Sequence, residues 1–306
     1  MKKLLAMMLV LIFCMSFAAC DQGGDSDYQV GVCQLMKHDA LDQATQGFVD
    51  ALKEEMEKAG KTVKIDVQVA GEASLCPTVI NAFTSKKVDL IMANATPALT
   101  TAATATSKIP VVGTSITDYN DIFKGEIPSN VTGTSDAVPF GEQAQMMIDS
   151  LGLVSGDQVG VLYCTNESNS LVQYNAVKGY FEEKGIKVKA YTFSENNELQ
   201  SVVNSLVTEC KALYVPSDNT VAQNDSVVGM ICNEKKVPVY TSYGGSVCYA
   251  SLAIDYYQLG RETGVMAAQI LLEGKKPSEL EIKTLVPTVS YNKELCDQLG
   301  ITVSGN

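Results

Sequence analysis

The residues best suited to bind a small molecule stand together in the stretch PSDNT, where Ser217, Asp218 and Asn219 follow the apolar run ALYV. Hydroxyl, carboxylate and amide groups in one loop can hold a polar solute by hydrogen bonds, without covalent chemistry. The same residue types are good helix N-caps, and a helical pattern follows them. The two roles are compatible, because an N-cap side chain can also face a ligand, and we favour binding.

A second corner of this kind occurs in the first half of the chain, because the sequence repeats itself. Three pairs of stretches correspond, namely VGVCQL with VGVLYC, VDLIMANATPA with CKALYVPSDNT, and KIPVVGTS with KVPVYTSY. Val30 corresponds to Val159, and Pro110 to Pro238, so the offset stays nearly constant along the chain. Under this repeat Asp218 corresponds to Thr96.

Each half alternates short apolar runs with helical patterns. Continuous apolar runs are typical of strands buried on both faces of a parallel sheet, and Phe48, Leu52 and Met56 give the first helix an apolar stripe. The sequence therefore predicts an α/β protein of two doubly wound, Rossmann-like lobes joined by a hinge. Ligands bind such sheets beyond the carboxyl ends of the strands. The loops expected to line a cleft between the lobes are 34–39, 96–97, 115–118, 165–170, 217–220 and 242–245.

Motifs for catalysis and for cofactors are missing from the sequence. It contains no GxSxG, GxxxxGK[ST], HExxH or GxGxxG, so nucleophile-elbow, P-loop, zincin and dinucleotide interpretations have no motif support. The one histidine, His38, stands at an expected helix start, where capping or a place at the ligand's rim is preferred over a role as general base. We expect no enzyme, no cofactor and no metal site.

The charged residues favour a ligand that carries both charges. Arg261 is the only arginine, so an anionic group would be held by hydroxyls and by backbone N–H groups at helix N-termini. Thr96 can cap a helix there, and Pro97 suits its first position. The carboxylates that could neutralise a cationic group are Glu167, Asp218 and Asp255. This combination suggests a zwitterion such as an amino acid.

The first twenty residues differ from the rest of the chain. Two lysines precede an apolar run and then small residues, which predicts a signal peptide over 1–19. FAAC resembles the lipobox of bacterial lipoproteins, so we expect Cys20 to be lipidated and 20–27 to form a flexible tether. A signal peptide with a coincidental cysteine is the alternative. Lipid would be the only membrane anchor, because no later run reaches the ~20 apolar residues of a span.

The net charge and the cysteine spacing argue against nucleic-acid binding and against zinc or redox sites. The chain has a formal net charge of −12 at pH 7, which disfavours nucleic acid as a partner, because its phosphates are bound by basic groups. No CxxC pair occurs among the cysteines after Cys20, so zinc and thioredoxin-like chemistry lack their usual spacing. Cys33 and Cys164 lie in apolar runs, and we interpret most of these cysteines as buried thiols.

Seven stretches together resemble one protein family. They are GVCQLMKHDALDQATQGFVDALKE, DLIMANATPA, IPVVGTSITD, NVTGTSD, VGVLYCTNESNS, YVPSDNTV and AIDYYQLGRETGVMAAQIL. Over nearly all of residues 28–305 the chain resembles the substrate-binding lipoproteins of ABC importers, in the tryptophan/tyrosine-type branch of the class I periplasmic-binding fold. The resemblance implies a monomeric, exported lipoprotein at the cell surface or in the periplasm. It would close around an amino acid, most often aromatic, and deliver it to ABC permease and ATPase subunits.

The resemblance also implies which residues bind the ligand. Its motifs carry over to NESNS, PSDNT and ATP, whereas TSYGG departs from the Gly-Ser-Glu-Glu-Gly-like loop of the family and leaves the ligand's identity open. Tyr243 would stack on an aromatic ligand or simply pack. The candidate ligand-binding residues are Gln34, Thr96, Pro97, Ser115, Asp118, Glu167, Asn169, Ser170, Asp218, Asn219, Tyr243 and Asp255.

The same fold implies that the chain passes between the lobes several times. We expect lobe 1 at 28–136 and 255–280, and lobe 2 at 137–254 and 281–306, with hinge closure over the ligand. Two alternatives stay open: a ligand sensor whose closed lobes are recognised by a receptor, and a binding protein for a sugar or another small solute. A surface enzyme on this scaffold is disfavoured by the lone histidine.

Overall fold

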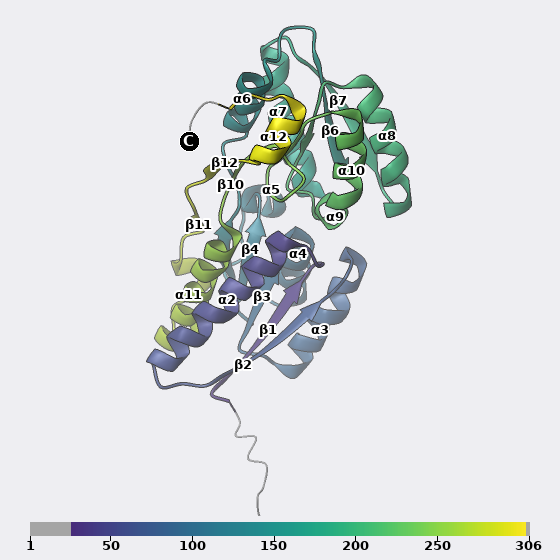
Figure 1. Ribbon diagram of the computed structural model, residues 1–306. Coiled ribbons are helices and arrows are strands. Elements are labelled where there is room, and N and C mark those ends of the chain that lie inside the picture. Colours follow the sequence, from purple (N-terminus) through teal and green to yellow (C-terminus); the bar gives the residue numbers. More distant parts are fainter. Residues whose placement is uncertain (1–25, 304–306) are drawn as a thin grey trace, which may run out of the picture.

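The computed structural model describes residues 26–303. The expected signal peptide and the lipidation site at Cys20 lie outside this range. Within it the chain forms two α/β lobes, each built on its own sheet (Figure 1). The predicted fold class is confirmed. No helix in residues 26–303 combines the length and apolar character needed to cross a membrane.

Lobe 1 has a six-stranded parallel sheet in the order β11-β5-β4-β3-β1-β2. Its strands are β1 (Tyr28–Gln34), β2 (Val63–Val69), β3 (Leu90–Asn94), β4 (Val111–Ile116), β5 (Val131–Ser135) and β11 (Lys283–Thr284). Its helices are α2 (Asp39–Lys58), α3 (Cys76–Lys86), α4 (Thr96–Ala105), α5 (Tyr119–Phe123) and α11 (Tyr256–Glu273), with short 3₁₀ turns η1 (Ala73–Leu75) and η3 (Pro277–Glu279). Every residue of β3 and β4 is buried, as the continuous apolar runs predict.

Lobe 2 repeats the plan in the order β12-β10-β9-β8-β6-β7, with β12 antiparallel to β10 at one edge. Its strands are β6 (Gln158–Cys164), β7 (Lys187–Phe193), β8 (Ala212–Val215), β9 (Val239–Thr241), β10 (Ala250–Ala253) and β12 (Thr288–Tyr291). Its helices are α6 (Phe140–Leu151), α7 (Ser168–Glu183), α8 (Leu199–Glu209), α9 (Asn219–Gln223), α10 (Asp225–Lys235) and α12 (Lys293–Leu299), with the 3₁₀ turn η2 (Asn196–Glu198).

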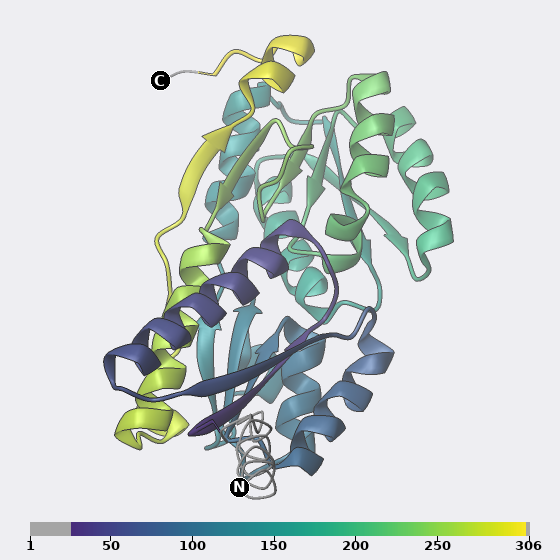
Figure 2. The ribbon, with the colours of Figure 1, turned by 60° about the horizontal axis from the view of Figure 1, so that its bottom comes forward.

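The chain passes between the lobes three times, after β5, after β10 and after β11 (Figure 2). The last passage differs from the expected boundary at 281. Lys283 and Thr284 pair with β5 of lobe 1, so the chain leaves lobe 1 only after Thr284. The added strand covers the open edge of β5, which would otherwise expose unpaired backbone groups.

Lobe 1 also begins earlier in the chain than expected. The carboxylate of Asp27, the last residue of the expected tether, accepts a hydrogen bond from the Thr62 backbone N–H at 2.9 Å and pairs with Lys61 at 3.0 Å. Asp27 is therefore part of lobe 1. Downstream, the cysteines within residues 26–303 are buried and unpaired, in agreement with their interpretation as core thiols.

Helix α11, which follows the second passage between the lobes, is held on lobe 1 by close contact with α2, and both views show the two helices side by side. The contact requires glycine. A Cβ on Gly260 would lie 2.0 Å from the Ala44 carbonyl oxygen, and a Cβ on Gly47 would lie 2.0 Å from the Tyr257 carbonyl oxygen. The apolar face of α2 is buried beneath this contact, with Phe48 and Leu52 fully buried.

Gly260→Ala should lower the free energy of unfolding by about 1–3 kcal/mol, because the added methyl group forces the two helices apart. Gly179→Ala is the matched control, since Gly179 lies exposed within α7 and a Cβ there meets nothing within 4 Å. That control should be neutral or stabilising by up to about 1 kcal/mol. Chemical denaturation measures both variants, and equal stabilities for the two would contradict the packing argument.

Candidate functional site

The loops at the carboxyl ends of the strands of both lobes enclose a small space, which we call the inner cavity. Its volume is about 10 Å³, enough for one water molecule. It is lined by His38, Ala40, Leu41, Ser115, Asp136 and Tyr256 on the lobe 1 side and by Asn169, Ser217, Asp218, Asn219, Ala222 and Tyr243 on the lobe 2 side. The corners at 38–41 and at Ser115 of lobe 1 therefore meet their counterparts at Asn169 and Tyr243 of lobe 2. Thr96 and Pro97, which correspond to the corner at 217–220, do not line this cavity.

Two hydrogen bonds join the lobes beside this cavity. The side chain of Gln173 on α7 donates to Thr117 Oγ1 at 3.3 Å. His38 Nε2 lies 3.2 Å from Asn219 Oδ1. Because the amide nitrogen of Asn219 donates to Glu167, the Asn219 oxygen faces His38, and His38 Nε2 carries the hydrogen. The lobes thus meet directly at their polar rims.

The inner cavity collects buried polar atoms that lack a partner. Three such side-chain atoms occur in residues 26–303, and two of them, Ser115 Oγ and Asn169 Oδ1, belong to residues that line this cavity. Ser115 also has a left-handed backbone, with φ at 56°, which is strained for a residue other than glycine. An unsatisfied buried polar atom costs about 1–3 kcal/mol, so both atoms are suited to bond a ligand.

Asp218 is fully buried and acts as the N-cap of α9. Its carboxylate accepts hydrogen bonds from the Val221 N–H at 2.9 Å, the Cys164 N–H at 2.8 Å and the Ser170 hydroxyl at 2.8 Å. Burial raises its pKa well above the ordinary value, and the nearby charge of Glu167 raises it further. Asp218 both caps helix α9 and lines the inner cavity, so its position is compatible with capping and with ligand binding.

Glu167 lies behind the cavity wall and binds the start of α9. One carboxylate oxygen accepts from the backbone and hydroxyl of Thr220, each at 2.7 Å, and the other accepts from the backbone and amide of Asn219 at 2.9 and 2.6 Å. These contacts place Asn219 where it meets His38. Glu167 itself lines a separate groove of about 480 Å³ together with Pro97.

Four other candidates have roles within lobe 1. Gln34 is buried and bonds the Met36 carbonyl at 2.7 Å, so it fixes the loop between β1 and α2 and does not line the inner cavity. Asp118 and Asp255 are N-caps, of α5 and α11 respectively. Helix α4 already includes Thr96, and Ala95 occupies the cap position, so the expectation that Thr96 caps this helix is wrong.

Asp136 also lines the inner cavity, although it is not among the ligand-binding residues expected from the sequence. It follows β5, where the chain leaves lobe 1, and it accepts hydrogen bonds from Tyr256 at 3.0 Å and Thr117 at 3.1 Å. Burial raises the pKa of its carboxyl group. Its place after a buried strand, in NVTGTSD, is the signal that could have identified it.

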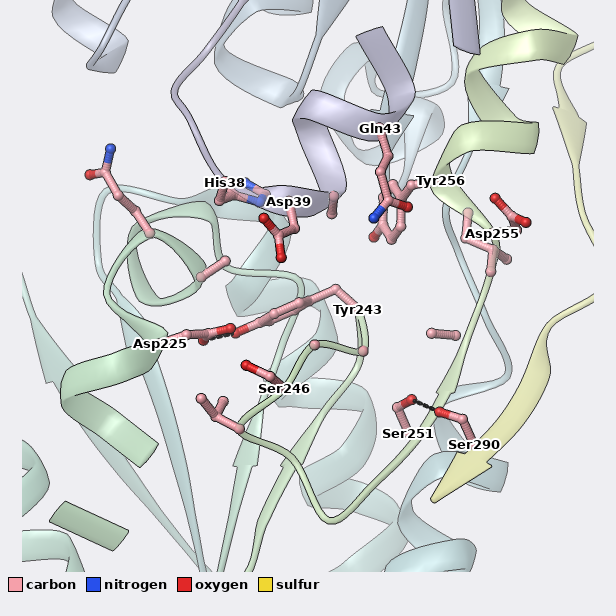
Figure 3. Close-up of a pocket in the computed structure, with 18 of the residues that line it drawn as sticks. His38, Asp39, Gln43, Asp225, Tyr243, Ser246, Ser251, Asp255, Tyr256 and Ser290 are labelled. Carbon is pink, nitrogen blue, oxygen red and sulfur yellow. Dashed lines mark hydrogen bonds between the residues drawn. The ribbon is translucent and has the colours of Figure 1, made fainter. Parts of the chain in front are cut away.

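A larger space, which we call the outer groove, adjoins the inner cavity and has a volume of about 710 Å³ (Figure 3). Asp39 of lobe 1 and Asp225 of lobe 2 both line it, and Asp255 stands exposed at its rim. The Tyr243 hydroxyl donates to Asp225 Oδ1 at 2.6 Å. Burial raises the pKa of Asp225 to about 7, against the effect of the Tyr243 hydrogen bond and with a further contribution from the charge of Asp39.

Sequence comparison places these features in a known family. The family described as "ABC transporter substrate binding protein" matches residues 29–306. The chain belongs to this family. A protein named "Tyrosine-binding protein" from Clostridioides difficile (strain R20291) is 34% identical over 269 residues, which is 85% of this chain and 76% of that protein. The chain is thus a substrate-binding protein of an ABC transporter, and such a protein works outside the cytoplasm with a permease as its partner.

Two solved structures of substrate-binding proteins resemble this one to different degrees. The L-Trp complex of an ABC domain from Streptococcus pneumonia is 32% identical, covers 90% of this chain and 96% of its own, and has a TM-score of 0.83. The ligand-free, open structure of a substrate-binding protein with adhesive properties from Clostridium difficile is 33% identical, covers 91% and 97%, and has a TM-score of 0.67. At nearly equal identity, the present structure is more similar to the complex than to the open structure.

The contribution of Asp225 to the stability of the fold should fall as the pH rises from about 4 to about 7. Asp225 has a raised pKa in the folded state, so it stabilises the fold while protonated and destabilises it once ionised. Asp225→Asn should reduce the fall in unfolding free energy across this range by roughly 1–3 kcal/mol. Asp39→Asn, which removes only the facing charge, should reduce it less. Superimposable pH profiles for the wild type and Asp225→Asn, from urea denaturation, would contradict this assignment.

Proposed function

We propose that this substrate-binding protein captures an amino acid, with an aromatic side chain preferred, between its lobes and delivers it to the permease of an importer. The observation that carries the proposal is the pair of unpartnered buried atoms, Ser115 Oγ and Asn169 Oδ1, in a cavity shared by both lobes. The name of the Clostridioides difficile relative and the L-Trp complex of the streptococcal relative support an aromatic amino acid.

The chemistry of the cavity suits a zwitterion. Asn169 Oδ1 can accept only, and so fits an ammonium group, whereas the Ser115 hydroxyl can donate to a carboxylate. Asp136 and Asp218 line the same cavity, and no salt bridge within residues 26–303 reaches either of them. Burial of these acids without a basic partner raises both pKa values, and a ligand ammonium group would supply the missing positive charge.

Closure by hinge motion follows from the arrangement of the chain. Three short segments connect the lobes, and the bonds from His38 to Asn219 and from Gln173 to Thr117 form only when the lobes meet. The higher TM-score with the L-Trp complex than with the open structure supports a ligand-induced change of this kind. A ligand that bonds both lobes would favour the closed form.

The remaining features of the proposal concern the whole chain. Lipid on Cys20 would anchor a monomer on the outer face of a membrane after removal of residues 1–19, and the cleft would bind its ligand without chemical conversion. The FAAC motif supports lipidation, and membership of a transport family supports binding without catalysis.

A thermal-shift screen followed by calorimetry tests the function. Residues 21–306 should gain thermal stability with one or a few amino acids, because a ligand that binds the folded state stabilises it by mass action. Sugars and nucleosides serve as comparison sets. A shift with a sugar and none with any of the common amino acids would replace the proposed ligand class.

Ser115→Ala should weaken amino acid binding by about 0.5–1.5 kcal/mol while leaving the stability of the free protein unchanged or slightly higher. The substitution removes a ligand bond and also removes an atom that is unsatisfied in the free protein. Ser85→Ala, at an exposed position of α3, is the control and should change neither quantity. Unaltered affinity in Ser115→Ala would remove this hydroxyl from the site.

A further inference from the structure

The outer groove is large enough for the side chain of an amino acid, whereas the inner cavity is not. The inner cavity holds about 10 Å³ and the outer groove about 710 Å³. Both are lined by His38, Ala40, Ala222, Tyr243 and Tyr256, so the two spaces are adjacent. If the proposed amino acid binds Ser115 and Asn169 through its charged groups, its side chain reaches the outer groove past the rings of Tyr243 and Tyr256.

Two carboxylates, those of Asp39 and Asp225, line the outer groove. Asp225 accepts one hydrogen bond, from Tyr243 to Oδ1, and its Oδ2 accepts none from residues 26–303. Figure 3 shows Asp39 extending from lobe 1 toward Tyr243 and Asp225 of lobe 2. Neither acid takes part in a salt bridge within the described residues. Of the basic residues that line the groove, Lys37 is exposed, and burial lowers the pKa of His38, so its imidazole is held neutral.

We propose that Asp225 determines specificity by accepting a hydrogen bond from the end of the ligand's side chain. The ligand class this selects is an amino acid whose side chain ends in a donor, such as a phenol hydroxyl, an indole N–H or an ammonium group. Side chains without a donor leave the carboxylate unsatisfied in a partly buried site, and anionic side chains are repelled by Asp225 and Asp39. The inference rests on the proposed function, since it assumes that the α-amino and α-carboxyl groups occupy the inner cavity.

Matched ligand pairs test the inference by calorimetry at pH 8, where Asp225 is ionised. Tyrosine should bind more tightly than phenylalanine, and tryptophan more tightly than 1-methyltryptophan, each by about tenfold or more, the effect of one hydrogen bond to a charged group. Asp225→Ala should reduce both ratios to near one. Asp225→Asn keeps the shape of the side chain and should give intermediate ratios, and it stands in for the alanine variant if that variant does not fold.

Glu294→Ala is the control, because Glu294 is also an acid in the first turn of a lobe 2 helix but lines neither space. Its ratios should match the wild type. Equal affinities within each ligand pair in the wild type would overturn the inference and leave the proposed function intact. Ratios that persist in both Asp225 variants would overturn the role of Asp225. Failure of every amino acid to bind would overturn the proposed function and this inference with it.

Discussion

The capping of α9 by two buried carboxylates is the interaction on which the cleft depends. Glu167 and Asp218 together accept hydrogen bonds from the first backbone N–H groups of this short helix and from the end of β6. A helix of five residues has little stability of its own, so these bonds fix where it begins. The cavity wall, the contact of Asn219 with His38 and the position of Asn169 all follow from that fixed corner.

The cleft residues of lobe 1 are positioned by helix packing, whereas those of lobe 2 are positioned by helix capping. The glycines of α2 and α11 allow the two backbones to touch, which holds the start of α11 close to the start of α2. Tyr256 and His38 stand at those two starts and face the inner cavity. Since the chain enters α11 directly from lobe 2, this helix pair also anchors the second passage between the lobes. Movement of the lobes must therefore occur in the short segments outside the helices.

The sequence predicts the fold well and the site only in part, for physical reasons. The two α/β lobes follow from hydrophobic periodicity, which is a local signal, and the pairing of loops across the cleft follows from the internal repeat. The final passage after Thr284 was missed because a two-residue edge strand has no periodicity to detect. The roles of Gln34, Thr96 and Asp118 could not be separated from ligand binding, because hydrogen bonding to backbone groups and to a ligand require the same residue types.

The number of hydrogen-bond partners of a polar side chain, rather than its residue type, distinguishes a ligand-binding side chain from a structural one. This number depends on the three-dimensional arrangement of the chain. Glu167 is satisfied on both oxygens, whereas Ser115 and Asn169 each keep one atom without a partner. Those free atoms, together with the acids that face each other across the outer groove, oppose closure in the absence of a compensating ligand. The bonds between His38 and Asn219 and between Gln173 and Thr117 favour closure by a similar amount, about 1 kcal/mol each. Because these favourable and unfavourable contributions to closure are similar in size, the open and closed forms of the free protein are close in free energy. A ligand that satisfies the free atoms can therefore shift the balance toward the closed form.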